Sequence, residues 1–259
     1  RAALELAREA AEMGEVPVGC VVFDEARGRY AICKDNYASH LKAGGVTVEN
    51  HSVMGYTVCQ AQLAEKDMRP GGVAAIEFGG NDCDLDWKAV SENPDVYHEA
   101  RTPIALFKDK LAEMVKKVRS FDMRAVLVVP PPIDAEKYFA WVSKNLDPRA
   151  ILKYLGDVQH IYRWQERYAL AVAEIGSKLN CTILNLREAF LVRGIKSLLC
   201  VDGIHPTPAG QRLMADCWIA PRPGTVLWND KSEPSKARFC LARVSDLLGQ
   251  RFADRFASR

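Results

Sequence analysis

Three short apolar runs, separated by longer helical patterns, constrain the fold of this chain most strongly. The runs cover residues 73–78, 125–129 and 182–185. The helical patterns alternate with them, at residues 102–120, 134–144 and 150–178, the last interrupted near Gly156. Short buried strands that alternate with helices are typical of a parallel sheet with helices on both faces. We therefore predict an α/β fold, a three-layer sandwich with a parallel sheet flanked by helices.

An aspartate and a histidine lie close together in a loop that precedes a predicted helix. Thr207 is the expected N-cap of this helix and Pro208 its first residue. Asp202 comes three residues before His205, a spacing that can orient an imidazole ring. In such a pair the carboxylate fixes the tautomer and stabilises the imidazolium, while the histidine acts as general base. The alternative is a surface loop with a solvated histidine.

A glycine turn after the first apolar run places an asparagine at the edge of the predicted sheet. The turn consists of Gly79, Gly80, Asn81 and Asp82. Open α/β sheets build their sites at the carboxyl ends of strands, and an asparagine amide there can donate to an oxyanion. Residues 46–50 are predicted as a further strand, followed by a turn into a helix that continues over residues 60–68. Gly55, in that turn, can offer a backbone N–H to the same oxyanion.

Three blocks of the chain resemble, in order and spacing, those of the SGNH (GDSL-type) hydrolases: Asn50 to Gly55, Gly79 to Asp82, and Asp202 to His205. The resemblance covers about residues 21–220 and implies an ester hydrolase with an SGNH/flavodoxin-like sandwich. It implies that His205 is the base, that Asp202 orients it, and that Asn81 and Gly55 donate to the oxyanion. The remaining block residues are expected to bind substrate: Gly80, Asn50 and Asp82. Asp82 alternatively bonds the amides of its own loop.

The family's first block, Gly-Asp-Ser, which supplies the serine nucleophile, occurs nowhere in the chain. If the hydrolase-like part is extended upstream without a gap, residues 14–16 (Gly-Glu-Val) fall in its place, and Val16 cannot attack an ester. Ser39, in a predicted helix, and Ser52, in a loop, lack the strand–turn–helix elbow that exposes a nucleophile, which favours structural roles. We therefore expect impaired ester hydrolysis. The alternative is a non-catalytic protein that keeps a ligand pocket.

The beginning of the chain resembles a second family. Residues 1–20, with Gly14-Glu15-Val16-Pro17-Val18-Gly19 at their end, look like the start of a tRNA adenosine deaminase. Deaminase chemistry needs a His-x-Glu and a Pro-Cys-x-x-Cys to hold zinc and move protons, and neither motif occurs. A deaminase-like nucleic-acid protein is therefore the least favoured hypothesis. We predict three parts: a deaminase-like helix segment at residues 1–20, the hydrolase-like domain at 21–220 and a basic tail at 221–259.

Charge and cysteine usage restrict the partners. A net charge of +2 gives no strong attraction to nucleic acid or membranes, and no apolar run has membrane-spanning length. The eight cysteines form no C-x-x-C pair, which favours reduced buried thiols in a cytoplasmic protein. Asp82, Asp84 and Asp86 alternate, but Trp87 and Asn93 stand where a calcium loop needs glycine and glutamate. We expect no metal and no cofactor, and a small-molecule ester or acylated carbohydrate as partner.

Four aromatic residues in the longest helical pattern could line an acyl or sugar pocket. They are Tyr154, Tyr162, Trp164 and Tyr168. The alternative, core and surface packing, is the more common role of aromatic residues on a helix.

Overall fold

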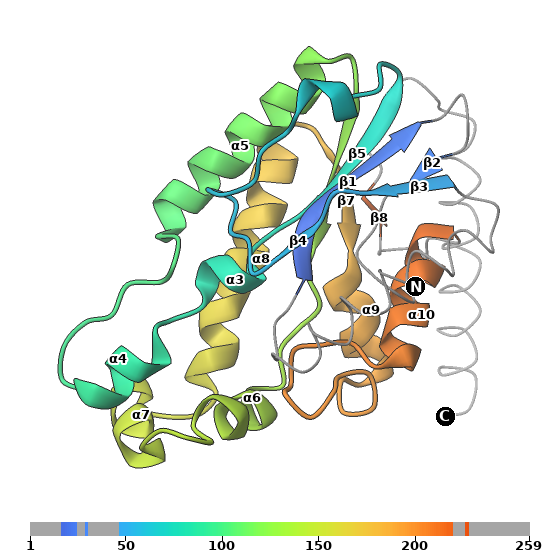
Figure 1. The fold of residues 1–259 in the computed structure, drawn as a ribbon. Coiled ribbons are helices and arrows are strands. Elements are labelled where there is room, and N and C mark those ends of the chain that lie inside the picture. Colours follow the sequence, from blue (N-terminus) through green and yellow to red (C-terminus); the bar gives the residue numbers. More distant parts are fainter. Residues whose placement is uncertain (1–16, 25–28, 31–46, 220–225, 228–259) are drawn as a thin grey trace, which may run out of the picture.

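The computed structural model describes residues 17–24, 29–30, 47–219 and 226–227, and its centre is a parallel three-stranded sheet. The strands are β5 (Gly72–Glu77), β6 (Arg124–Val129) and β7 (Thr182–Asn185). β5 pairs with β6 and β6 with β7, both in parallel (Figure 1). The predicted α/β sandwich is therefore confirmed, and its three central strands are the apolar runs of the sequence.

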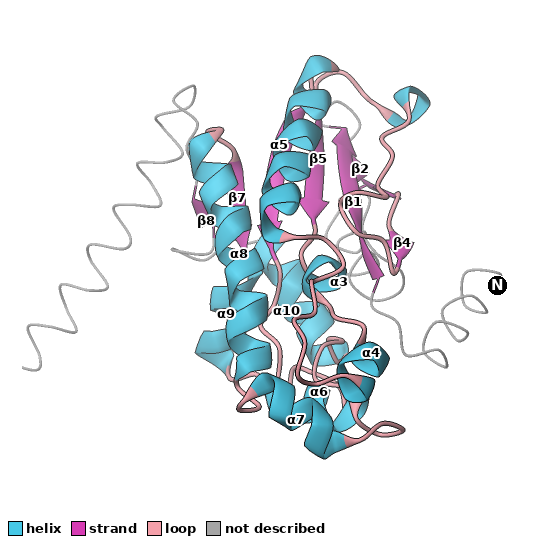
Figure 2. Ribbon diagram, turned by 90° about the vertical axis from the view of Figure 1, so that its left-hand side faces the viewer, coloured by secondary structure: helices cyan, strands magenta, loops and turns pink. Residues whose placement is uncertain are grey.

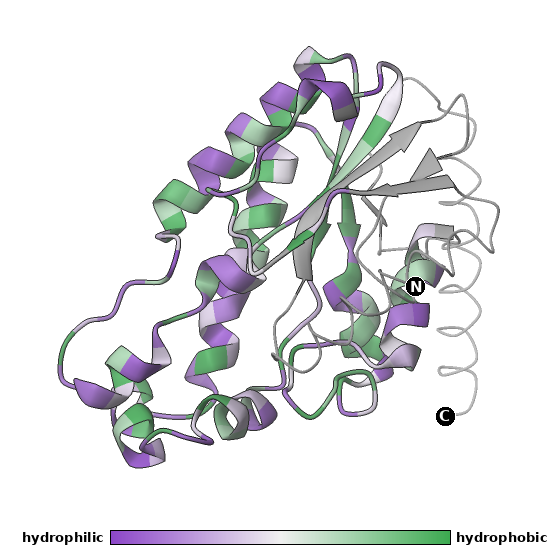
Figure 3. Cartoon of the chain, viewed as in Figure 1, coloured by the Kyte–Doolittle hydropathy of each residue, from purple (hydrophilic) through white to green (hydrophobic). Residues whose placement is uncertain are grey.

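Helices cover both faces of this sheet because successive strand residues point to opposite sides. Ala74 and Ile76 of β5 pack with α5 (Ile104–Ser120) and α8 (His160–Lys178), whereas Val73 and Ala75 pack with α9 (Leu186–Arg193) and α10 (Pro208–Ile219). Hydrophilic and hydrophobic residues alternate along α5 (Figure 3). Its buried residues recur every three or four positions: Phe107, Leu111, Met114, Val115 and Val118. This spacing gives one apolar stripe toward the sheet.

A separate group of short helices lies beyond the carboxyl ends of the parallel strands. α3 (Gly80–Cys83) follows β5 directly, and α4, α6 and α7 gather farther from the sheet (Figure 2). Their bounds are Trp87–Glu92, Ala135–Val142 and Pro148–Leu155. They share a small core of their own that includes Leu85, Val90, Tyr138 and Ile151. The ends of the strands therefore face a second apolar layer rather than open solvent.

One side of the sheet departs from the parallel pattern. β1 (Pro17–Asp24) pairs with β5 in antiparallel register, with Gly19 opposite Glu77. The short strands β2 (Arg29–Tyr30), β3 (Thr47–Asn50) and β4 (Val53–Met54) all pair with β1, and β8 (Val226–Leu227) pairs antiparallel with β7. Because β1 runs against β5, the start of β1 lies where β5 ends. Pro17 accordingly pairs with Met54, next to Gly55.

The helix expected to follow the turn at Gly55 and to continue over residues 60–68 does not form. Only a 3-10 turn, η1 (Glu65–Asp67), is present there. The amide of Val58 donates to Asp82 Oδ1 at 2.9 Å and the amide of Thr57 to Gln60 Oε1 at 2.9 Å. These donors are thus committed to side chains instead of to the carbonyl groups of a preceding helical turn. Conversely, α9 was not predicted and starts directly after β7, capped by Asn185, which accepts from the Glu188 amide.

Candidate active site

The turn after β5 is held by a buried carboxylate. Gly79 has a φ of 123°, a conformation that favours glycine, and leads the chain into α3. Asp82 is fully buried and accepts from the amides of Gly79, at 3.1 Å, and Val58, at 2.9 Å. Burial raises the pKa of Asp82, and these hydrogen bonds together with one from Thr102 partly oppose the rise. Asp82 thus joins the turn to the loop after β4.

Asn81 and Gly55 come together through this joint. Asn81 Nδ2 donates to the carbonyl of Tyr56 at 3.2 Å. Gly55 has a φ of 71°, and its carbonyl accepts from Arg101 Nη2 at 3.3 Å. Both residues line the same cavity. An amide side chain and a glycine backbone at one wall are suitable donors for a developing oxyanion.

The aspartate–histidine loop is also held tightly. His205 Nδ1 lies 2.5 Å from Asp202 Oδ2, while Asp202 Oδ1 accepts from the amides of Ile204 and His205 at 2.9 and 3.0 Å. Burial opposes the charge of Asp202, but the hydrogen bonds from His205 and the two amides outweigh it and lower its pKa. Asp202 is therefore a carboxylate at neutral pH. Such a group stabilises an imidazolium form of its histidine.

The surroundings of this loop explain its shape. Gly203 has a φ of 79°, and a Cβ there would lie 2.5 Å from the carbonyl oxygen of Asp134. The helix α10 begins as predicted, because Thr207 Oγ1 accepts from the amide of Gly210 at 3.3 Å. The His205 side chain is 21% exposed, so the alternative of a fully solvated surface histidine does not describe it.

One cavity of about 460 Å³ collects most of the predicted site. Gly55, Gly80, Asn81 and His205 all line it. Asp202 does not line the cavity but bonds the His205 side chain. Asp82 does not line it either; it accepts from loop amides, which is the alternative role considered for this residue. Asn50 lies in β3, paired with Val21 of β1, and its expected role in substrate binding stays a prediction.

The aromatic wall differs from the one expected. Of the four predicted residues only Trp164 lines the cavity. Tyr168 is buried and donates to the carbonyl of Thr102, Tyr154 packs against His98, and Tyr162 lies under Arg187. Besides Phe78, which directly follows β5, the other aromatic lining residues are Trp87, Tyr138 and Trp141. Trp87 follows the Asn81 turn closely, and Tyr138 and Trp141 lie three residues apart on α6. These spacings are the only sequence signal for the three residues.

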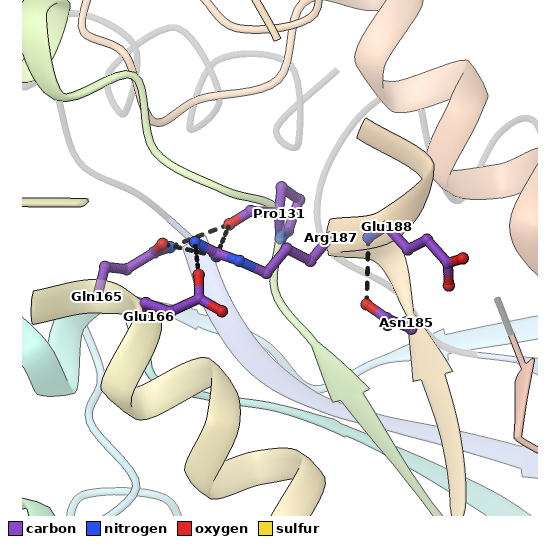
Figure 4. Close-up of polar contacts among 6 residues, drawn as sticks. All are labelled: Pro131, Gln165, Glu166, Asn185, Arg187 and Glu188. Atoms are coloured by element: carbon purple, nitrogen blue, oxygen red, sulfur yellow. Dashed lines mark hydrogen bonds and ion pairs between the residues drawn. The ribbon is translucent and has the colours of Figure 1, made fainter. Parts of the chain in front are cut away.

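A buried arginine supports the back wall of the cavity. Pro130, Pro131 and Pro132, which follow β6, form this wall. Arg187, on α9, forms an ion pair with Glu166, donates to Gln165 Oε1 at 2.8 Å and approaches the carbonyl of Pro131 at 3.5 Å (Figure 4). Gln165 in turn donates to the same Pro131 carbonyl at 3.0 Å. α8 and α9 are thereby tied to the wall through one guanidinium group.

A carboxyl group at the end of β5 was missed by the sequence analysis. Glu77 lines the cavity, and within the described residues its side chain has no hydrogen bond or ion pair. Burial raises the pKa of Glu77 from 4.5 to about 7. Its neighbours on the chain are apolar, and for this reason the run read as an ordinary buried strand.

The raised pKa of Glu77 predicts that stability depends on pH. Between pH 4.5 and about 7 the folded protein holds a proton that the unfolded chain releases, so the free energy of unfolding falls as pH rises through this window. We expect Glu77→Gln to stabilise the protein by about 3 kcal/mol at pH 8 and to change little at pH 4.5. Urea unfolding at both pH values measures this. Glu92→Gln, at an exposed glutamate of α4, is the control and should be neutral at both. An equal effect of Glu77→Gln at both pH values would contradict the assignment.

The cavity offers no obvious nucleophile. No serine or threonine of the described residues lines it. Cys83 does, but its thiol donates to the carbonyl of Gly80, and burial raises its pKa well above the ordinary value, so it remains protonated. Ser52 does not line the cavity, and Ser39 and Val16 lie outside the described residues.

The described residues also hold no cluster of three or more His, Cys, Asp or Glu side chains that could bind a metal ion. Among the helices of this same part of the chain, none is long and apolar enough to span a membrane. Within residues 51–219 the cysteines are free thiols: Cys59, Cys83, Cys181, Cys200 and Cys217.

Comparison with known proteins gives one family and several similar structures. The GDSL-like lipase/acylhydrolase family matches residues 18–213. No curated protein matches the chain. A lipase/acylhydrolase from Enterococcus faecalis is 19% identical with a TM-score of 0.40, and the alignment covers 61% of this chain and 64% of that one. The acetylxylan esterase Axe2 from Geobacillus stearothermophilus is 17% identical with a TM-score of 0.46, over 72% of this chain and 80% of the esterase.

Proposed function

The chain belongs to the GDSL-like lipase/acylhydrolase family, and we propose that it hydrolyses acyl esters of small molecules, slowly, with His205 as base. The observation that carries this proposal is the arrangement of His205, Asn81 and Gly55 around one cavity, with Asp202 bonded to His205. A cavity of about 460 Å³ has the size of a small-molecule site. An acetylated or otherwise acylated carbohydrate is one substrate class that it would admit.

The proposed reaction follows from the positions of these groups. His205 takes a proton from the attacking oxygen as that oxygen adds to the ester carbonyl, and Asp202 stabilises the imidazolium. The Asn81 amide and the Gly55 N–H donate to the oxyanion. When the tetrahedral intermediate collapses, His205 returns the proton to the departing alcohol. In a serine-bearing relative the attacking oxygen would be the serine hydroxyl; without Gly-Asp-Ser it is water, which accounts for the low expected rate.

A second candidate is ligand binding without turnover. It is favoured by one observation, the lack of a serine or threonine on the cavity lining of the described residues. The deaminase hypothesis gains no support, because neither zinc-binding motif occurs in the sequence. The three-part division of the chain into residues 1–20, 21–220 and 221–259 remains a prediction.

Steady-state hydrolysis of p-nitrophenyl acetate separates these candidates. We expect slow turnover above the buffer rate by the unmodified protein, falling at least tenfold in His205→Ala, because base catalysis contributes on the order of a hundredfold or more. His98→Ala, at a histidine outside the cavity that bonds the Asn93 carbonyl, is the control and should be unchanged. The absence of turnover would favour the binding protein. Strong labelling by a fluorophosphonate, mapped to a serine, would show a nucleophile that the proposal lacks.

A further inference from the structure

The half of the cavity that lies farther from the sheet is walled by aromatic rings from three helices. Trp87 comes from α4, Tyr138 and Trp141 from α6, and Trp164 from α8. Trp87 and Tyr138 meet edge to face, with ring centroids 5.9 Å apart. Trp141 is 37% exposed, so this half of the cavity is open to solvent at that residue. Flat aromatic faces of this kind can pack against the C–H faces of a ring-shaped ligand.

Asp84 is the polar centre of this aromatic half. Its Oδ1 accepts from the Tyr138 hydroxyl at 2.7 Å and from Trp87 Nε1 at 2.8 Å. Both side-chain donors therefore converge on one oxygen, and no side chain of the described residues donates to Oδ2. Burial raises the pKa of Asp84, which the bonds from Tyr138 and Trp87 partly oppose. The backbone amide of Leu85 bonds the same carboxylate. A carboxylate has about four acceptor positions, so one of them is left for a ligand.

The chemistry around Asp84 favours hydroxyl groups over a cation. Arg101 also lines the cavity, and its positive charge acts on Asp84. His160, stacked on Trp164, and Gln211 add groups that can donate as well as accept. A cationic ligand would be favoured only if the negative charge of Asp84 were not already balanced by Arg101. A mixture of hydrogen-bond acceptors and donors between aromatic side chains suits a ligand rich in hydroxyl groups.

We propose that Asp84 Oδ2 accepts a hydrogen bond from a hydroxyl of a sugar ring packed beside Trp87 and Tyr138. The ring of Trp164 is already covered by His160 and Arg167, so it closes this half of the cavity without stacking on the ligand. The alcohol part of the ester is then a carbohydrate, and the ring lies in the aromatic half of the cavity while its acyl group reaches Asn81 and His205. Asp84 follows Asn81 by three residues, so the sugar anchor and the oxyanion donor belong to one short segment. The assignment of this ring as the leaving alcohol rests on the proposed ester hydrolysis; the binding of the ring does not.

Asp84→Asn tests this subsite with little disturbance of the fold. The amide oxygen of asparagine can keep the bonds from Tyr138 and Trp87, and only Oδ2 changes from an acceptor into a donor. The probe is an unacylated methyl glycoside, titrated by calorimetry into the unmodified protein and the variant. We expect Asp84→Asn to weaken binding at least tenfold, since the variant presents a donor to the ligand hydroxyl in place of an acceptor. Asp86→Asn is the matched control, because Asp86 caps α4 two residues away and asparagine caps equally well.

The kinetics of two acetyl esters complete the test. For an acetylated methyl glycoside, Asp84→Asn should raise KM at least tenfold, a much larger change than for p-nitrophenyl acetate, while the control Asp86→Asn should leave the kinetics of both esters within twofold. Equal losses with both esters would show that Asp84 only supports the fold, and would overturn the inference. So would an unmodified protein that binds a small quaternary amine but no glycoside. If neither ester is hydrolysed, yet the glycoside binds and Asp84→Asn abolishes binding, the proposed function fails and the sugar subsite stands.

Discussion

Replacing Glu15 by Asp and Val16 by Ser together is expected to raise p-nitrophenyl acetate hydrolysis about a hundredfold. The double substitution restores Gly-Asp-Ser in front of β1. Pro17, the residue after Val16, pairs with Met54 beside Gly55, at the edge of the sheet where Asn81 also lies. A serine nucleophile contributes far more than a hundredfold in a complete triad, but a misplacement of about 1 Å can cost on the order of a hundredfold.

The control for this gain is the single variant Glu15→Asp, which adds no nucleophile and should leave the rate unchanged. A fluorophosphonate should label the double variant and not the unmodified protein. If the double variant stays at the rate of the unmodified protein and is not labelled, residue 16 is not at the nucleophile position, and the ungapped alignment of this segment is wrong.

Replacing Arg187 by Met is expected to lower the free energy of unfolding by about 3 kcal/mol, the low end of the usual cost of removing one partner from a buried ion pair, because the Glu166 side chain that remains is 31% exposed. The Arg187 side chain is only 6% exposed, and its loss leaves Glu166 and Gln165 Oε1 without their partner (Figure 4). Urea unfolding followed by circular dichroism measures the change.

The matched control is Arg163→Met, which breaks the ion pair with Asp157 on the protein surface. That arginine is 56% exposed and its partner 57%, so water and salt screen the pair and the expected loss is much smaller than for Arg187. If the two substitutions cost the same, Arg187 does not hold the Pro131 wall as described.

The central strands and the histidine loop could be predicted because their signals are local. Apolar runs of four to six residues favour buried strands, and a Thr-Pro pair favours a helix start through contacts within its own few residues. The antiparallel direction of β1 could not be predicted, since an apolar strand carries no sign of its direction. The missing helix near Thr57 depends on Asp82, 24 residues from the Val58 amide that it bonds. That contact exists only in the folded chain.

Some residues of the candidate site could be predicted from the sequence and others could not. Asn81, Gly55 and His205 stand in blocks with recognisable spacing. Glu77 and Asp84 belong to no such block, and Tyr138 reaches the cavity only because α6 packs beyond the strand ends. Their importance comes from burial and from mutual contacts, such as the bond between Tyr138 and Asp84, across 54 residues of sequence.

The account as a whole depends on His205 acting as base over the Asn81 and Gly55 donors. The measurement that tests this most directly is p-nitrophenyl acetate hydrolysis by the Glu15→Asp, Val16→Ser protein with and without a third substitution, His205→Ala. The account predicts that His205→Ala removes the restored activity, returning the rate to that of the unmodified protein or below it. Restored activity that survives His205→Ala would contradict the account, because the nucleophile would then be activated without the Asp202–His205 pair.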